Sequence, residues 1–143
     1  MDLRRAEQLA VSLAELHNVD KNDWTGPDIP TGKPWSFMWD DGGLPIDITA
    51  ITRFDTADIV MNQRVLVLND EAIFREIFVH ELAHTKIDPF LDEDHGPVWK
   101  AMAYSMGCEL SVPTGSIPAG YLNHPEPTVE ELIGMMLRGH VTV

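Results

Sequence analysis

The apolar positions near the start of the chain repeat with the period of a helix. Within residues 3–16, Leu9, Leu13 and Leu16 lie on or near one stripe, and the charged residues lie elsewhere. This spacing predicts an amphipathic helix over residues 3–16 that buries its leucine stripe against the rest of the domain.

A loop is expected over residues 18–34, which are rich in Asp, Asn, Gly and Pro. Trp24 lies within this segment, and Trp35 comes directly after it. Because large aromatic side chains are mostly buried in folded proteins, we expect these two residues to attach the loop to the domain.

Short apolar runs and alternating patterns predict three strands of a small sheet, at residues 35–39, 46–54 and 64–68. The third contains four consecutive aliphatic residues, which favours burial on both faces. Residues 59–61 belong either to a further strand or to the turn before residue 64. Within the second strand, the alternation places these side chains on one face: Ile46, Ile48, Ala50 and Thr52.

Two helices are expected after the strands. Asn69 or Asp70 caps the first, which runs to about Thr85. The second covers residues 96–106, with a proline in its first turn and Gly107 marking its end.

The last part of the chain, residues 113–143, is expected to be an appendage of the domain. Residues 113–127 are irregular and rich in Pro and Gly, and a capping-box pattern opens a helix over residues 128–138. The order of helix, strands and further helices predicts an α+β fold. At 143 residues, the chain fits one domain, residues 1–143.

The composition narrows the possible functions and compartments. The formal net charge is −13, with 10 Lys and Arg residues, which disfavours direct binding to nucleic acid. Cys108 is the sole cysteine, so no internal disulfide or cysteine-based zinc ribbon can form, and its thiol is expected to be buried and inert. The sequence has no signal-like segment and no apolar run long enough for a membrane. We therefore expect a cytoplasmic protein without membrane association.

The most informative motif is His80-Glu81-Leu82-Ala83-His84, inside the longer of the two later helices. Histidines at this spacing project from the same helix face, so both imidazoles can share one metal ion. Zinc binds neutral imidazole well, and a catalytic zinc site keeps one position open for water. Glu81 lies beside the histidines, where its carboxylate can act as general base for zinc-activated water. The alternative is a pair of core histidines satisfied by hydrogen bonds.

A third metal ligand is expected near the start of the next helix. His95 opens a stripe that continues through Trp99 and should face the core. Asp88, Asp92 and Asp94 are alternatives, but a proline directly after Asp88 is expected to end the preceding helix before that residue is held rigidly. We therefore favour His95.

Other residues are weaker candidates for a role in catalysis. Tyr104 and Tyr121 are possible donors to a reaction oxyanion, although packing is the more common role of tyrosine. The four tryptophans could line a substrate cleft, but such residues more often fill cores. Surface positions are expected for the remaining histidines: His17, His124 and His140.

The motifs resemble those of the SprT-like (Spartan-type) zinc metallopeptidases. Residues 80–84, a short acidic loop and the HGPVW run of residues 95–99 are similar to that family's HExxH motif and its second helix, which opens with His-Gly-Pro and an aromatic residue. Residues 65–69 also resemble the family's strand that ends in Asn or Ser before the HExxH helix. The resemblance covers about residues 64–107.

The resemblance implies a small zincin-type metallopeptidase domain with a short three- to four-stranded sheet over the HExxH helix. It also implies that His80, His84 and His95 bind Zn²⁺ and that Glu81 is the catalytic acid and base. Eukaryotic members use basic and zinc-ribbon elements to find DNA–protein crosslinks. This targeting function does not transfer to so acidic a chain with one cysteine.

The sequence therefore predicts a zinc-dependent metalloendopeptidase that acts on a protein or peptide substrate. Two alternatives stay open: a non-catalytic, zinc-containing module that binds proteins, and a hydrolase of a non-peptide amide. The presence of Glu81 favours an enzyme, because a purely structural zinc site has no need of a carboxylate beside the water position.

Overall fold

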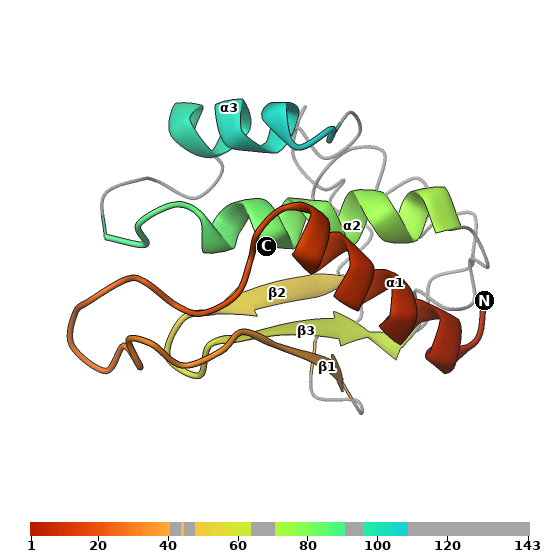
Figure 1. The fold of residues 1–143 in the computed structure, drawn as a ribbon, viewed down its shortest axis with the longest axis horizontal. Helices are drawn as coiled ribbons and strands as arrows, with labels where there is room; N and C mark the ends of the chain where they lie inside the picture. Colours follow the sequence, from red (N-terminus) through yellow and green to blue (C-terminus); the bar gives the residue numbers. More distant parts are fainter. Residues whose placement is uncertain (41–43, 45–47, 64–70, 91–95, 109–143) are drawn as a thin grey trace, which may run out of the picture.

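The computed structural model describes residues 1–40, 44, 48–63, 71–90 and 96–108. Figure 1 shows the elements in chain order. They are α1 (Leu3–Leu16), β1 (Ser36–Asp40), β2 (Ala50–Arg53), β3 (Asp58–Asn62), α2 (Glu71–Thr85) and α3 (Pro97–Ser105). The predicted α+β fold is confirmed, with a three-stranded sheet among the described residues. No helix in the described ranges combines the length and apolar character needed to cross a lipid bilayer.

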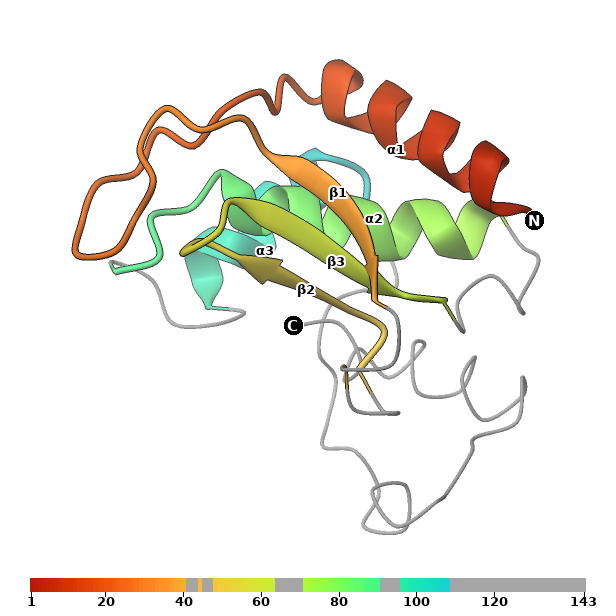
Figure 2. The same ribbon diagram turned by 90° about the horizontal axis from the view of Figure 1, so that it is seen from below.

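The strand β3 lies at the centre of the sheet, whose order is β1-β3-β2. It pairs in parallel with β1 and antiparallel with β2, as Figure 2 shows from the sheet side. All five residues of β3 are buried. Among the described strands, β2 pairs only with β3, so β2 forms one edge of the sheet.

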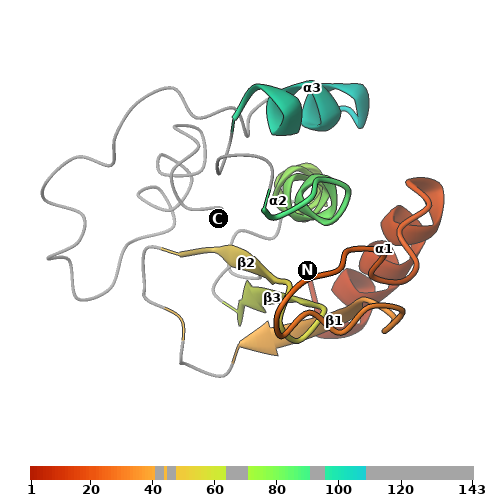
Figure 3. The ribbon, with the colours of Figure 1, turned by 90° about the vertical axis from the view of Figure 1, so that its left-hand side faces the viewer.

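The helix α2 lies between two layers, with the sheet on one side and α3 on the other (Figure 3). Helix α1 packs alongside α2. Every residue from 77 to 83 is buried, which covers nearly two full turns of the helix. A helix covered on opposite sides needs apolar residues around its whole circumference, and this explains why α2 has no strong polar face.

Aromatic side chains fill the core between β1 and α2. The ring of Phe37 on β1 lies edge-on to Phe78 on α2, with ring centroids 5.4 Å apart. Phe78 in turn stacks on Phe74 at 5.9 Å. Such pairs add specific geometry to the burial of large apolar surfaces, so they help fix the position of α2 against the sheet.

The loop of residues 18–34 is attached to the domain as the sequence predicts. The indole Nε1 of Trp24 donates a hydrogen bond to the carbonyl oxygen of Thr85 at 2.8 Å. The backbone N–H of Trp35 donates to the carbonyl oxygen of Asp20 at 2.9 Å. The loop is therefore tied to the last residue of α2, directly after the second motif histidine.

One expectation about the elements needs correction, and one open alternative is decided. Leu16 was expected in the buried stripe of the first helix, but it is 70% exposed, and the stripe ends at Leu13. Residues 59–61, expected either in a further strand or in the turn before residue 64, form the middle of the central strand, so the first alternative is confirmed. The full length of this strand is difficult to predict from the sequence, because its apolar run of three residues has a polar residue at each end, Asp58 and Asn62. Both are buried: Asp58 is paired with Arg53, and Nδ2 of Asn62 donates to the carbonyl oxygen of Ile48.

Other boundaries agree with the sequence or lie outside the described residues. The strand expected over residues 46–54 is observed as Ala50–Arg53, and residues 54–57 form a turn. The expected strand at residues 64–68, the helix cap at Asn69 or Asp70 and the last helix at residues 128–138 fall outside the described ranges.

Candidate metal centre

The two motif histidines converge on one point in the structure. His80 and His84 are one helical turn apart on α2, and their Nε2 atoms are 3.3 Å apart. The side chain of His80 is fully buried, and that of His84 is partly buried. The predicted shared face of the two imidazoles is therefore present in the folded chain.

The distance between these nitrogen atoms fits a shared zinc ion. Two imidazole nitrogens bound to one tetrahedral zinc, each at about 2.0–2.1 Å, lie about 3.3–3.4 Å from each other. The observed separation of 3.3 Å has this value. Imidazole also suits zinc chemically, so both the donor type and the spacing of His80 and His84 fit the metal that the sequence predicts.

The third predicted ligand, His95, lies outside the described residues, so its role stays a prediction. Among the residues that are described, no group of three or more His, Cys, Asp or Glu side chains forms a ligand cluster. In the sequence, His95 directly precedes Gly96, which is the N-cap of α3.

The helix α3 contributes an aromatic wall to the site. Trp99 is 1% exposed, and its ring centroid lies 4.4 Å from that of His80 and 5.1 Å from that of His84. Its ring is nearly parallel to that of His84, with an interplanar angle of 24°. Trp99 thus holds both imidazoles in place and shields them from solvent on one side.

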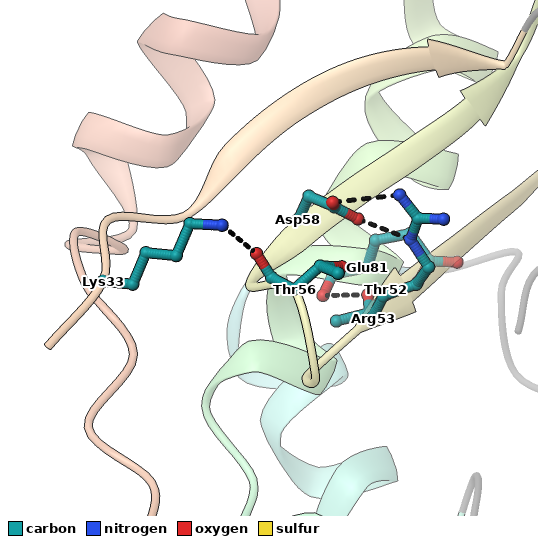
Figure 4. A network of polar contacts seen from close by, with 6 residues as sticks. All are labelled: Lys33, Thr52, Arg53, Thr56, Asp58 and Glu81. Carbon is teal, nitrogen blue, oxygen red and sulfur yellow. Dashed lines mark hydrogen bonds and ion pairs between the residues drawn. The ribbon is translucent and has the colours of Figure 1, made fainter. Parts of the chain in front are cut away.

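The carboxyl group of Glu81 lies between α2 and the edge strand β2. Glu81 is fully buried, and its Oε2 accepts a hydrogen bond from Oγ1 of Thr52 at 2.5 Å. The same hydroxyl oxygen lies 3.2 Å from the main-chain oxygen of Glu81. Figure 4 shows this contact between the strand and the helix. The sequence places Thr52 on the correct strand face, but nothing in it indicates that Thr52 contacts Glu81.

A second polar pair stabilises the end of β2 next to this contact. Arg53 and Asp58 lie directly opposite each other on β2 and β3. Two nitrogens of the Arg53 guanidinium donate to the two Asp58 oxygens, at 2.7 and 3.0 Å (Figure 4). Hydrogen bonding to Asp58 raises the pKa of Arg53, so the guanidinium stays charged. This bidentate pair favours the register in which Thr52 faces α2.

Comparison with known proteins identifies the family. A model of the SprT-like family matches residues 35–120, which is more than half of the chain. The chain belongs to the SprT-like family. The matched range includes all three strands, α2 and α3, and therefore contains the histidine pair, Glu81 and Thr52. No curated protein and no solved structure matches the chain significantly.

The other candidate residues of this SprT-like domain have different roles or lie outside the described ranges. Asp88, the main competitor of His95, accepts a hydrogen bond from the backbone N–H of Phe90 at 2.9 Å and so stabilises the turn after α2. Tyr104 is 59% exposed on α3. His17 is partly buried at the C-cap of α1. The positions that fall outside the described residues are Asp92, Asp94, Tyr121, His124 and His140.

The tryptophans of this SprT-like domain mostly pack against other side chains. Trp35 contacts Phe54, and Trp39 contacts Phe37, in each case with the two rings edge to face. Trp24 donates its hydrogen bond to Thr85. Of the four, Trp99 is therefore the one with a described ring contact to the motif histidines.

Proposed function

We propose that this SprT-like protein is a zinc-dependent metalloendopeptidase. In this proposal His80, His84 and His95 hold Zn²⁺, and Glu81 is the general base. The main support is the convergence of the two imidazole nitrogens at 3.3 Å next to a buried glutamate on the same helix. A carboxylate that is buried beside potential metal ligands favours a catalytic site over a structural one.

The proposed reaction divides the work between the metal and the protein. When bound, zinc would act as a Lewis acid and lower the pKa of a water molecule to about 7. Glu81 would take the proton of the attacking water and then deliver it to the leaving nitrogen. His80 and His84 would keep their Nε2 atoms directed at one point, and Trp99 would hold both rings and exclude bulk water.

The edge strand supports a peptide as the substrate. Because β2 pairs on one side only among the described strands, its other side can add an extended peptide through main-chain hydrogen bonds. Thr52 connects this strand directly to Glu81. The net charge of −13 favours a cationic or neutral substrate and disfavours direct contact with nucleic acid.

The test compares the wild-type protein with the Glu81→Gln variant. We expect purified wild-type protein to contain about one zinc ion per chain and to cleave an unfolded, lysine-rich protein. Glu81→Gln should keep the zinc but lose activity by about 10²- to 10⁴-fold, because general acid–base catalysis contributes a factor of this size. Metal analysis and the rate of appearance of new amino termini provide the measurements. Glu15→Gln, an exposed glutamate on α1, is the matched control and should remain fully active.

Each alternative predicts a different result. If both proteins bind zinc and neither cleaves any of a broad set of proteins or amides, the chain is a non-catalytic binding module. If a small non-peptide amide is hydrolysed and unfolded proteins are not, the substrate class is wrong. Equal proteolytic activity of wild-type protein and Glu81→Gln would exclude the proposed role of Glu81.

A further inference from the structure

The hydroxyl of Thr52 makes a short contact with the proposed general base. Its Oγ1 lies 2.5 Å from Oε2 of Glu81, compared with 3.2 Å from the main-chain oxygen of the same residue. Hydrogen bonds from a hydroxyl to a charged oxygen are typically about 2.5–2.7 Å long and are stronger than bonds between neutral groups. Since threonine has one hydroxyl proton, the shorter distance identifies the Glu81 carboxylate as its main acceptor.

The sheet holds this hydroxyl in place. Thr52 lies opposite Ile59 in the register of β2 and β3, and the next residue pair in this register is Arg53 with Asp58. A shift of one residue would turn Thr52 to the other face of the sheet, away from α2. The bidentate pair between Arg53 and Asp58 opposes such a shift. The position of the hydroxyl is thus determined by the sheet, while Glu81 belongs to the helix.

A glutamate general base benefits from such a contact. Its side chain has three rotatable bonds, and a displacement of about 1 Å at a reacting group can cost on the order of 10²-fold in rate. Glu81 is fully buried, where a charged carboxylate is stable only with hydrogen-bond donors nearby. A donor on a separate, rigid element meets both needs.

We propose that Thr52 is a positioning residue for the general base of this site. Its hydroxyl holds Oε2 of Glu81 and thereby fixes the carboxylate relative to the two imidazoles. The inference rests on the proposed peptidase function, and it adds a residue of the edge strand to the catalytic machinery. It also implies that the strand expected to align the substrate is the same one that orients the base.

Two substitutions of Thr52 and one control substitution test the proposal kinetically. Thr52→Val keeps a β-branched side chain that suits a strand but removes the hydroxyl. It should lower kcat by about 10- to 100-fold and change KM by less than about twofold, since the loss affects orientation and not substrate binding. Thr52→Ser loses the strand-favouring methyl group but keeps the hydroxyl, and kcat should stay within about threefold of the wild-type value. Zinc content should be the same in all proteins.

Thr56→Val is the matched control for the substitution itself. Thr56 lies in the turn between β2 and β3, and its buried Oγ1 has no hydrogen-bond partner among the described residues. Its main-chain oxygen accepts a hydrogen bond from Lys33, which the substitution leaves intact (Figure 4). The control should therefore show wild-type kcat and KM.

A second readout does not depend on activity. Thr52→Val should lower the midpoint of thermal unfolding of the full-length chain by about 4 °C, because a buried carboxyl group loses a donor. In a Glu81→Ala background, the same substitution should cost less than half of that shift. The difference measures the coupling between the two side chains, because Thr52→Val removes the contact with the main-chain oxygen of residue 81 equally in both backgrounds.

The outcomes separate this inference from the proposed function. If wild-type protein cleaves peptides and Thr52→Val has wild-type kcat, the positioning role is wrong while the peptidase stands. The same holds if Thr52→Ser is as slow as Thr52→Val, or if the loss is confined to KM. If no variant and no wild-type protein cleaves any substrate, the peptidase proposal fails. The positioning role fails with it, and thermal coupling then shows only whether the contact forms.

Discussion

Cys108 shows how burial controls the reactivity of a single side chain in this protein. The residue follows α3 and is 1% exposed. Burial raises the pKa of its thiol to about 12, and the negative charges of Glu76 and Glu81 act in the same direction. The expected burial of the thiol is therefore confirmed. The raised pKa favours the protonated form at neutral pH, which is consistent with the predicted low reactivity.

This residue provides a direct test of the packing around α3. A pKa that rises from 9.0 to about 12 lowers the thiolate fraction at pH 8 by about a thousandfold. We expect native protein to resist a chromogenic disulfide reagent at pH 8 and to react fully in denaturant. Ser105→Cys would add an exposed thiol on α3 as an internal reference that reacts rapidly. Rapid modification of two thiols in that native variant would contradict the burial of Cys108.

Burial also distinguishes the motif residues from the other residues of the core. Fully buried polar side chains need partners, and His80 and Glu81 are both fully buried. The described contacts provide some of these partners: the neighbouring imidazole for His80, and the Thr52 hydroxyl for Glu81. Each contact links groups that can take part in catalysis, whereas a core residue of α2 such as Phe78 packs against the rings of Phe37 and Phe74.

At the scale of elements, an ion pair between Arg53 and Asp58 adds to the backbone pairing of the edge strand β2 with β3. Arg53 is partly exposed, with 42% of its side chain accessible, but its partner Asp58 is 7% exposed. Loss of the guanidinium would leave a buried carboxylate without its two charged donors. The exposure of Arg53 reduces the effect, because water screens one side of the pair.

We therefore expect Arg53→Met to lower the free energy of unfolding by about 1–2 kcal/mol. Urea unfolding followed by circular dichroism measures this change. Arg5→Met is the matched control, since Arg5 makes a similar bidentate pair with Glu71 where both side chains are exposed. That control should have almost no effect on stability. An equal loss in both variants would show that the Arg53 pair has no special role in holding β2.

At the scale of the whole molecule, the proposed zinc would connect α2 with the segment before α3. Trp99 on α3 already connects this helix to α2 through its contacts with the histidine rings. A ligand that binds only the folded state adds about 1.4 kcal/mol of stability for each tenfold excess over its dissociation constant. The metal should thus stabilise the packing of α3 on α2 as well as the local site.

We expect removal of zinc with a chelator to lower the midpoint of thermal unfolding, and added zinc to restore it. His84→Ala should abolish this response, because one of the two converging imidazoles is lost. His17→Ala, which removes a histidine at the C-cap of α1, should keep it. A zinc-dependent shift of the same size in His84→Ala would contradict the proposed centre.

The same measurement identifies the third ligand. His95→Ala should weaken zinc binding strongly, whereas Asp88→Ala should leave it nearly unchanged, because the Asp88 carboxylate already stabilises the turn at Phe90. The opposite pattern would assign the ligand to Asp88 and overturn our choice of His95. Zinc titration with a competing fluorescent chelator provides the affinities.

The fold could be predicted from sequence where its causes are local. The helix at residues 3–16, the end of α2 at Thr85 and the extent of α3 follow from periodicity and from proline and glycine signals. The central position of β3 could not be predicted in this way, because strand order depends on pairing between distant segments. The exposure of Leu16 could not be predicted either, since a position on an apolar stripe is buried only where another element covers it.

By itself, the sequence determined the spacing of His80, Glu81 and His84 on one helix, and with it the predicted chemistry and the family resemblance. These are local properties, because one helical turn fixes which side chains share a face. Only the tertiary structure decided that Thr52, from a strand 29 residues away, contacts Glu81, and that Trp99 covers both imidazoles. Such contacts arise from the packing of separate elements, and no short-range pattern in the chain encodes them.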